Sequence, residues 1–197
     1  MKDHPTSRRS ALRGIGFLLG AGAIGLDFSE VARAAHDAHQ AAASPETTTL
    51  TLLGAADAAD IEALTIQIVP TDDLPGAREA GAIWFIDRAL GSFFAHWREG
   101  FMLGLGEFQA ACHAHNPDAA SFAAMTSERQ MEFLRTVDTT PFFEQARTLT
   151  LCALLSSPKY GGNRDGAGWK ILGFEDQHVF EPPFGYYDRD VENGSAT

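Results

Sequence analysis

The stretch FAHWREGFMLGLGEFQAAC, residues 94–112, decides the fold of this chain. Its large apolar residues recur every three or four positions, the spacing that places side chains on one face of an α-helix. The members of this stripe are Phe94, Trp97, Phe101, Leu105, Phe108 and Cys112. The pattern predicts a long amphipathic helix that ends at Asn116-Pro117.

The same periodicity predicts two helices before this stretch. The first begins near residue 55, with Asp57 as its N-cap, and stops at Pro70, because proline cannot continue a helix. Thr71 to Gly76 has the composition of a turn. The second helix is predicted from Ala77 to Leu90.

Two start signals predict further helices after it. Ser127-x-x-Gln130 has the form of a capping box before an apolar run. Thr140-Pro141 combines an N-cap with a proline at the first helical position, and the helix that follows runs to about Ser156. We therefore expect an all-α fold, a compact bundle of five or six helices.

The character of the chain changes after Pro158. Residues 159–170, KYGGNRDGAGWK, are dense in glycine, charge and aromatics, and residues 181–188, EPPFGYYD, form an aromatic strip bounded by prolines. We expect a long irregular C-terminal segment that either packs on its own bundle or lies against another protein. The candidate partner contacts are Tyr160, Asn163, Arg164, Trp169, Tyr186 and Tyr187, because aromatic and arginine side chains commonly anchor interfaces.

The N-terminus has the layout of an export signal. Arg8 and Arg9 precede an apolar run, residues 14–26, that is too short to span a membrane, and an A-x-A motif predicts cleavage between Ala34 and Ala35. Paired arginines indicate the twin-arginine translocase, which carries folded proteins to the periplasm. The predicted organisation is a signal peptide (1–34), a flexible linker (35–50), a helical domain (51–190) and a disordered tail (191–197).

Charge excludes some partners, and the cysteines leave one question open. The chain has a net charge of −11, and removal of residues 1–34, with five Lys/Arg and three Asp/Glu, changes it to −13. A strongly acidic protein is a poor ligand for nucleic acid or anionic lipid. Cys112 and Cys152 both lie on apolar helix faces, so they are either buried free thiols or a disulfide that the periplasm would permit.

No residue pattern in the chain predicts catalysis. The tract Cys112-His113-Ala114-His115 places its side chains on different faces of a helix, unlike the i, i+4 pairs of metal sites. The carboxylates of Asp72 and Asp73 suit a turn. We therefore expect no catalytic, metal-binding or cofactor-binding residue on this chain, and a partner that holds the cofactor.

Two blocks of sequence resemble the gluconate 2-dehydrogenase subunit 3 family. The early block (residues 70–87) contains PTDDLPGAREAG and FID, and the late block (residues 158–170) contains PKYGGNRDG and GWK. A third motif, PPFGYY, occupies residues 182–187. The resemblance covers residues 50–190, nearly all of the chain that follows the export signal.

This resemblance implies a small, non-catalytic subunit. It implies a large FAD-binding partner of the glucose–methanol–choline oxidoreductase type, in some complexes with a cytochrome c subunit that holds haem c. It also implies that the small chain provides the export signal for a sugar, sugar-acid or glycoside dehydrogenase. The alternative from the residues alone is a standalone periplasmic helical domain that binds or scaffolds.

Overall fold

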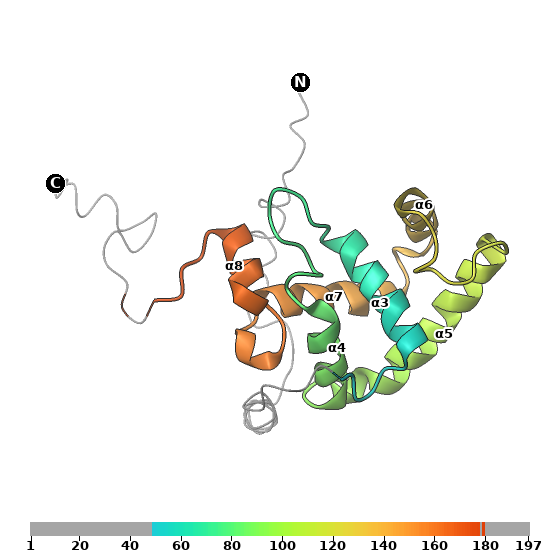
Figure 1. Cartoon of the computed structure of the whole chain (residues 1–197). Coiled ribbons are helices and arrows are strands. Elements are labelled where there is room, and N and C mark those ends of the chain that lie inside the picture. Colours follow the sequence, from blue (N-terminus) through green and yellow to red (C-terminus); the bar gives the residue numbers. More distant parts are fainter. Residues whose placement is uncertain (1–48, 178, 180–197) are drawn as a thin grey trace, which may run out of the picture.

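The computed structural model describes residues 49–177 and 179, and this part of the chain is all-α (Figure 1). The predicted export signal, its predicted cleavage site, residues 35–48 of the predicted linker and the predicted tail 191–197 lie outside the described residues. The six α-helices of the described part are α3 (Ala55–Ile68), α4 (Ala82–Gly91), α5 (Arg98–His115), α6 (Ser127–Val137), α7 (Pro141–Leu155) and α8 (Ala167–Leu172). Three short 3₁₀ helices, η1 (Ala95–Trp97), η2 (Pro158–Tyr160) and η3 (Arg164–Gly166), join them. The prediction of an all-α bundle is confirmed.

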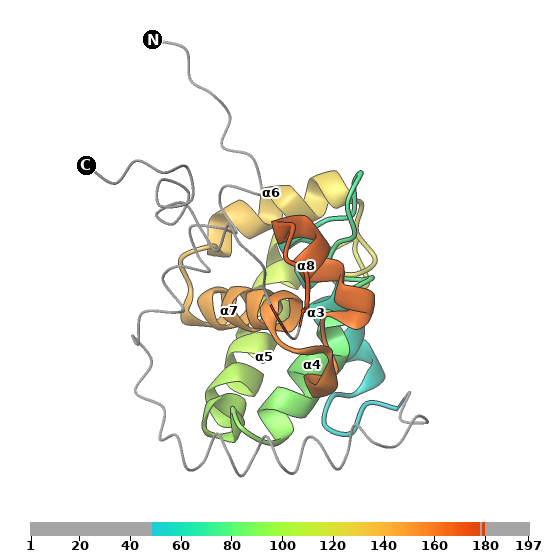
Figure 2. The ribbon, with the colours of Figure 1, turned by 90° about the vertical axis from the view of Figure 1, so that its left-hand side faces the viewer.

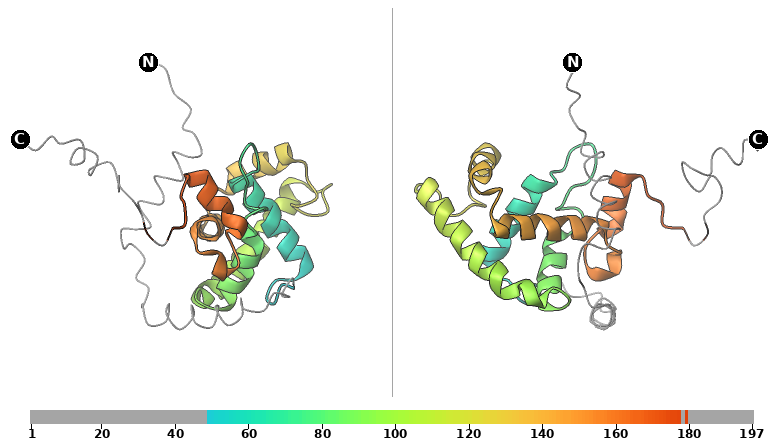
Figure 3. Two further views of the ribbon diagram at one scale, coloured as in Figure 1. Left: turned by 60° about the vertical axis from the view of Figure 1, so that its left-hand side comes forward. Right: turned by 180° about the vertical axis from the view of Figure 1, so that it is seen from behind.

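Helix α7 runs through the middle of the fold. It contacts α3, α4 and α5 along its length and α8 beyond its C-terminal end. In Figure 1 the short helix α8 lies at one end of the molecule and α6 near the other, and Figure 2 shows α8 close to α7 from the side. The view from behind in Figure 3 shows α5 running obliquely past α7. The two ends of α7 therefore lie in different parts of the molecule, one beside α8 and the other on the side of α6.

The core is rich in phenylalanine. Phe108 has its ring centroid 5.1 Å from that of Phe122, 5.2 Å from that of Phe133 and 5.2 Å from that of Phe142. All four side chains are buried, and aromatic pairs at such separations add stability beyond the area they bury. The apolar stripe quoted at the outset therefore faces the bundle interior, as its spacing predicted.

Two predicted helix boundaries are wrong in an informative way. Residues 77–81 form turns rather than the start of a helix, because Gly81 adopts φ +69°, a left-handed conformation that interrupts the helical path. The long predicted helix begins instead as η1, and α5 starts only at Arg98.

Asp57 is not the N-cap of α3, because the capping position is Gly54. It lies in the first turn of α3, and its carboxylate accepts a hydrogen bond from Gln109 Nε2 at 3.0 Å.

The capping residue of α6 is Thr126, one position before the serine that the sequence pattern indicated. The Thr126 hydroxyl accepts a hydrogen bond from the backbone N–H of Arg129 at 3.4 Å. The predicted glutamine partner is buried and used elsewhere, because Gln130 Nε2 donates to the carbonyl of Phe122 at 2.9 Å. The predicted Thr140-Pro141 start of α7 is confirmed, and the Thr140 hydroxyl accepts from Phe143 N–H.

We expect Thr126→Ala to lower the free energy of unfolding by about 1 kcal/mol, since the substitution removes the side-chain acceptor at the start of α6. Ser127→Ala is the matched control and should change it by less than about 0.5 kcal/mol. Ser127 is exposed in the first turn, and the hydrogen bond that its hydroxyl accepts from Gln67 Nε2 at 3.0 Å is also exposed to solvent. Urea denaturation of both variants measures the difference. Equal losses for the two variants would contradict the assignment of the cap.

Asp87 fixes the segment that precedes α3. Its carboxylate Oδ1 accepts from the backbone N–H groups of Leu52 and Leu53, and Oδ2 accepts from the backbone N–H and hydroxyl of Thr51, all at 2.8–2.9 Å. Burial opposes ionisation of Asp87, but these hydrogen bonds outweigh it and lower the pKa of the carboxyl group. A charged Asp87 on α4 therefore holds the first described turn of the chain against the bundle.

Candidate partner-binding site

The early and late blocks, far apart in the sequence, meet at the C-terminal end of α7. The backbone N–H of Arg164 donates to the carbonyl of Ala80 at 3.2 Å. The Arg164 guanidinium carbon lies 5.2 Å from the ring centroid of Trp84, within range of a cation–π interaction. The two sequence blocks that carry the family resemblance therefore form one continuous region.

Asn163 organises the late block from within. Its side chain is fully buried, its Nδ2 donates to the Ser156 carbonyl at 2.9 Å, and its Oδ1 accepts from Gly168 N–H at 2.8 Å. The residue adopts φ +46°, a left-handed conformation that asparagine tolerates better than most side chains. Asn163 was predicted as a partner contact, but both polar atoms of its side chain are hydrogen-bonded inside the fold, and the side chain has no exposed surface.

The late block packs directly on the backbone of α7. A Cβ atom added at Gly168 would lie 1.8 Å from the Leu154 carbonyl oxygen, and one at Gly162 would lie 2.4 Å from that of Ala153. Trp169 Nε1 donates to the Leu155 carbonyl at 3.2 Å. Asn163 and Trp169 thus bond carbonyls at the end of α7 that have no partner within the helix. Gly162 and Gly168 lack a side chain, and this allows the late block to lie directly against the backbone of α7.

The outer surface of this region combines aromatic rings and positive charges. The ring centroid of Tyr160 lies 6.1 Å from that of Phe93, and Lys159 Nζ lies 5.1 Å from the Tyr160 centroid. The pKa of Arg164 is lowered, first by burial and then by the charge of Arg88, while Asp165 acts in the opposite direction. Planar guanidinium groups beside aromatic rings are suited to binding, and they supply no nucleophile.

The structure brings four of the six predicted contact residues into this region. Tyr160 and Trp169 are half-buried, Arg164 is exposed and Asn163 is buried. Tyr186 and Tyr187 lie outside the described residues. The sequence prediction missed Trp84 and Arg88, which lie one helical turn apart on α4. Their i, i+4 spacing beside the FID motif was the available signal.

The cysteines are both free thiols, so no disulfide joins Cys112 on α5 to Cys152 on α7 in the structure. Burial raises the pKa of the Cys152 thiol to about 11. Within residues 49–177 and 179, no group of three or more His, Cys, Asp or Glu residues is placed to hold a metal ion. In the same residues no helix is both long and apolar enough to cross a bilayer.

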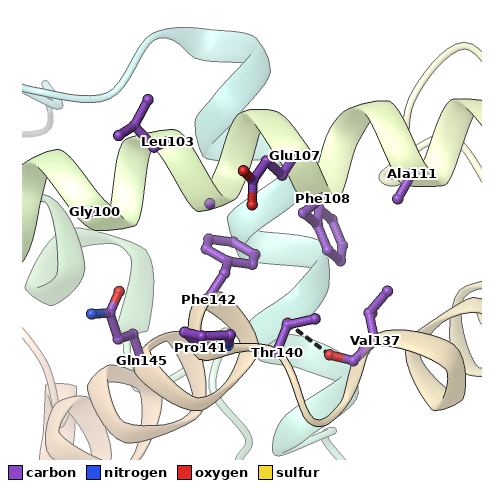
Figure 4. A pocket seen from close by; sticks show the side chains of 11 residues that line it. Gly100, Leu103, Glu107, Phe108, Ala111, Val137, Thr140, Pro141, Phe142 and Gln145 are labelled. Atoms are coloured by element: carbon purple, nitrogen blue, oxygen red, sulfur yellow. Dashed lines mark hydrogen bonds between the residues drawn. The ribbon is translucent and has the colours of Figure 1, made fainter.

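A concave surface lies between α5 and α7 (Figure 4). Phe142 packs against Gly104 there, since a Cβ at Gly104 would lie 2.7 Å from Phe142 Cβ. Leu103 lies at its edge and is 66% exposed. In Figure 4 the carboxylate of Glu107 and the amide of Gln145 line the same groove, which is otherwise mostly apolar.

Comparison with known proteins identifies the chain at the level of family. The family model for gluconate 2-dehydrogenase subunit 3 matches residues 55–176, a range that holds both sequence blocks. Searches of curated proteins and of solved structures gave no match. Because the matched range covers most of the chain and coincides with the described helical domain, the chain belongs to the gluconate 2-dehydrogenase subunit 3 family.

Proposed function

We propose that this chain is the non-catalytic small subunit of a periplasmic, FAD-dependent dehydrogenase that oxidises a sugar, a sugar acid or a glycoside. The FAD belongs to a large subunit of the glucose–methanol–choline oxidoreductase type, and in some complexes of this kind a cytochrome c subunit with haem c is a third member. The small subunit stabilises the large one. It also provides the twin-arginine signal that takes both through the translocase as a folded pair.

Family membership carries this proposal, because the family is named as a subunit of a dehydrogenase, gluconate 2-dehydrogenase subunit 3. Two further observations support it. The sequence begins with paired arginines, an apolar run and a cleavage motif, the layout of a signal for folded cargo. The two blocks that carry the resemblance come together on one surface, which gives a partner a single place to bind.

Co-expression tests delivery. The large subunit would be produced with the wild-type chain, with an Arg8→Lys/Arg9→Lys variant, or alone, and dye-linked sugar dehydrogenase activity and flavin absorbance would be measured in periplasmic and cytoplasmic fractions. We expect periplasmic activity only with the wild-type chain. The Arg8→Lys/Arg9→Lys variant should leave active flavoprotein in the cytoplasm, because it removes the signal while the helical domain is unchanged.

The alternative, a standalone binding or scaffolding domain, gives a different result. In that case the chain would purify from the periplasm as a colourless monomer, and the large subunit would reach the same compartment without it. Full periplasmic activity of the large subunit alone would therefore refute the proposed function.

A further inference from the structure

Arg88 directly follows the early block and Arg164 belongs to the late block, yet they lie over the same face of α4. Trp84 and Arg88 are one turn apart on that helix, and Arg164 stacks over the Trp84 ring at 5.2 Å. Arg88 is close enough that its charge lowers the pKa of Arg164. We call these two residues the arginine pair.

Two glycines make room for the arginine pair. Gly81 has φ +69°, and a Cβ atom there would lie 2.6 Å from Nε of Arg164. Gly161 has φ +96°, and a Cβ atom there would lie 2.8 Å from Nη1 of Arg88. Each arginine side chain therefore crosses close to a glycine whose positive φ disfavours any other residue. Arg88 is partly buried by this packing, and Arg164 keeps an exposed surface that a partner can reach.

The arginine pair is electrostatically unbalanced. Within residues 49–177 and 179, no carboxylate lies at ion-pair distance from either guanidinium, and the ion pair between Arg129 and Asp118 is in another part of the fold. Asp165 favours the charged form of Arg164 only at longer range. Two neighbouring positive charges repel each other, and partial burial makes the repulsion larger than in water. The chain has 26 Asp and Glu residues, yet none of those that the structure describes forms an ion pair with these two arginines. A negative charge on another protein would therefore balance the two positive charges.

We propose that the arginine pair binds a carboxylate of an acidic segment on the large subunit, with the rings of Trp84 and Tyr160 packing around it. This inference rests on the proposed function. The donor fork of a guanidinium matches a carboxylate in shape and charge, and such bonds are about twice as strong as neutral ones. Arginine, tryptophan and tyrosine are also the residue types that carry most of the affinity at protein interfaces.

The test uses the full chain co-expressed with the large subunit. Arg88→Glu reverses one charge of the pair, and Arg135→Glu is the matched control, because Arg135 is exposed on α6 away from this surface. Removing one member of a desolvated charge pair weakens association by about 30-fold or more. We expect Arg88→Glu to weaken binding by at least this factor and Arg135→Glu to leave it within about twofold. Raising the salt concentration should weaken the wild-type complex and affect the Arg88→Glu complex less.

Thermal melting of each small subunit shows whether the variants are folded. A cross-link on the wild-type complex provides a test that needs no variant. A carbodiimide couples lysine to a carboxylate in direct contact, and Lys159 lies beside Tyr160 at the same surface. We expect mass spectrometry to find Lys159 joined to an Asp or Glu of the large subunit.

Several results would overturn the inference. Wild-type affinity of a folded Arg88→Glu chain would do so, and so would a wild-type complex in which Lys159 forms no cross-link to the large subunit. Inorganic phosphate that raises the melting temperature of the wild-type chain but not of Arg88→Glu, with unchanged subunit association, would replace the inference with a small-anion site. If the wild-type chain binds no large subunit at all, the proposed function itself fails.

Discussion

Gly168→Ala should lower the free energy of unfolding by about 3 kcal/mol, at the upper end of the usual penalty for overpacking. The added Cβ would lie 1.8 Å from the Leu154 carbonyl oxygen and 2.5 Å from the carbonyl carbon. Both atoms belong to the backbone of α7, so no side-chain rotation relieves the clash. The late block would have to separate from α7, and this would also break the hydrogen bonds that Asn163 Nδ2 and Trp169 Nε1 donate to the carbonyls of Ser156 and Leu155.

Urea denaturation measures this loss, and α5 offers a matched control. Gly106 lies inside that helix, and a Cβ there would have no heavy atom within 4 Å. Gly106→Ala should therefore raise the free energy of unfolding by about 0.5–1 kcal/mol, because alanine restricts the unfolded chain and favours helix. Similar stabilities for the two variants would show that the late block does not approach α7 so closely.

Asp87→Ala should cost about 3 kcal/mol of stability. The carboxylate accepts four hydrogen bonds, and its loss leaves the N–H groups of Leu52 and Leu53 unpaired at a largely buried site. Asp73→Ala is the control, since Asp73 is exposed in the turn before α4, and it should change stability by less than about 0.5 kcal/mol. Chemical denaturation at neutral pH measures both values.

The Asp87 effect should depend on pH in a defined direction. The folded state lowers the pKa of Asp87, so its contribution is fully present above the ordinary aspartate pKa and is lost as the pH falls through the folded value. The difference in stability between wild type and Asp87→Ala should be constant near neutral pH and shrink below about pH 4. A difference that grows on acidification would contradict the assignment of a charged Asp87.

The sequence predicted most of the bundle because its signals are local. The stripe from Phe101 to Cys112 specifies α5, and the prolines at 70, 141 and 158 mark helix ends that the structure confirms. The errors arose where a tertiary contact outweighs a local signal. Gly81 turns the chain so that Arg164 can pack on it, and periodicity in residues 77–90 contains no trace of that contact.

For the candidate site, the sequence predicted which residues of the late block lie together better than it predicted the contacts that each of them makes. Composition alone marked the late block as unusual, and four of its predicted residues do lie together. Asn163 could not be assigned from sequence, because its hydrogen-bond partners include a carbonyl at the end of α7, a group with no side-chain signature. The arginine pair was missed because the sequence pattern gives Arg88 the position of an ordinary polar residue on the outer face of an amphipathic helix. The contact between Arg88 and Gly161 is visible only in the structure.

The meeting of the early and late blocks has a consequence during synthesis. Translation releases the early block long before Arg164 can donate its N–H to the Ala80 carbonyl. Until residues 161–169 emerge, the last carbonyls of α7 lack the side-chain donors of Asn163 and Trp169, and the face of α4 around Trp84 stays uncovered. A chain that ends before Gly168 would thus expose an aggregation-prone surface. The domain can complete its folding only after the late block has been synthesised and has packed against α4 and α7.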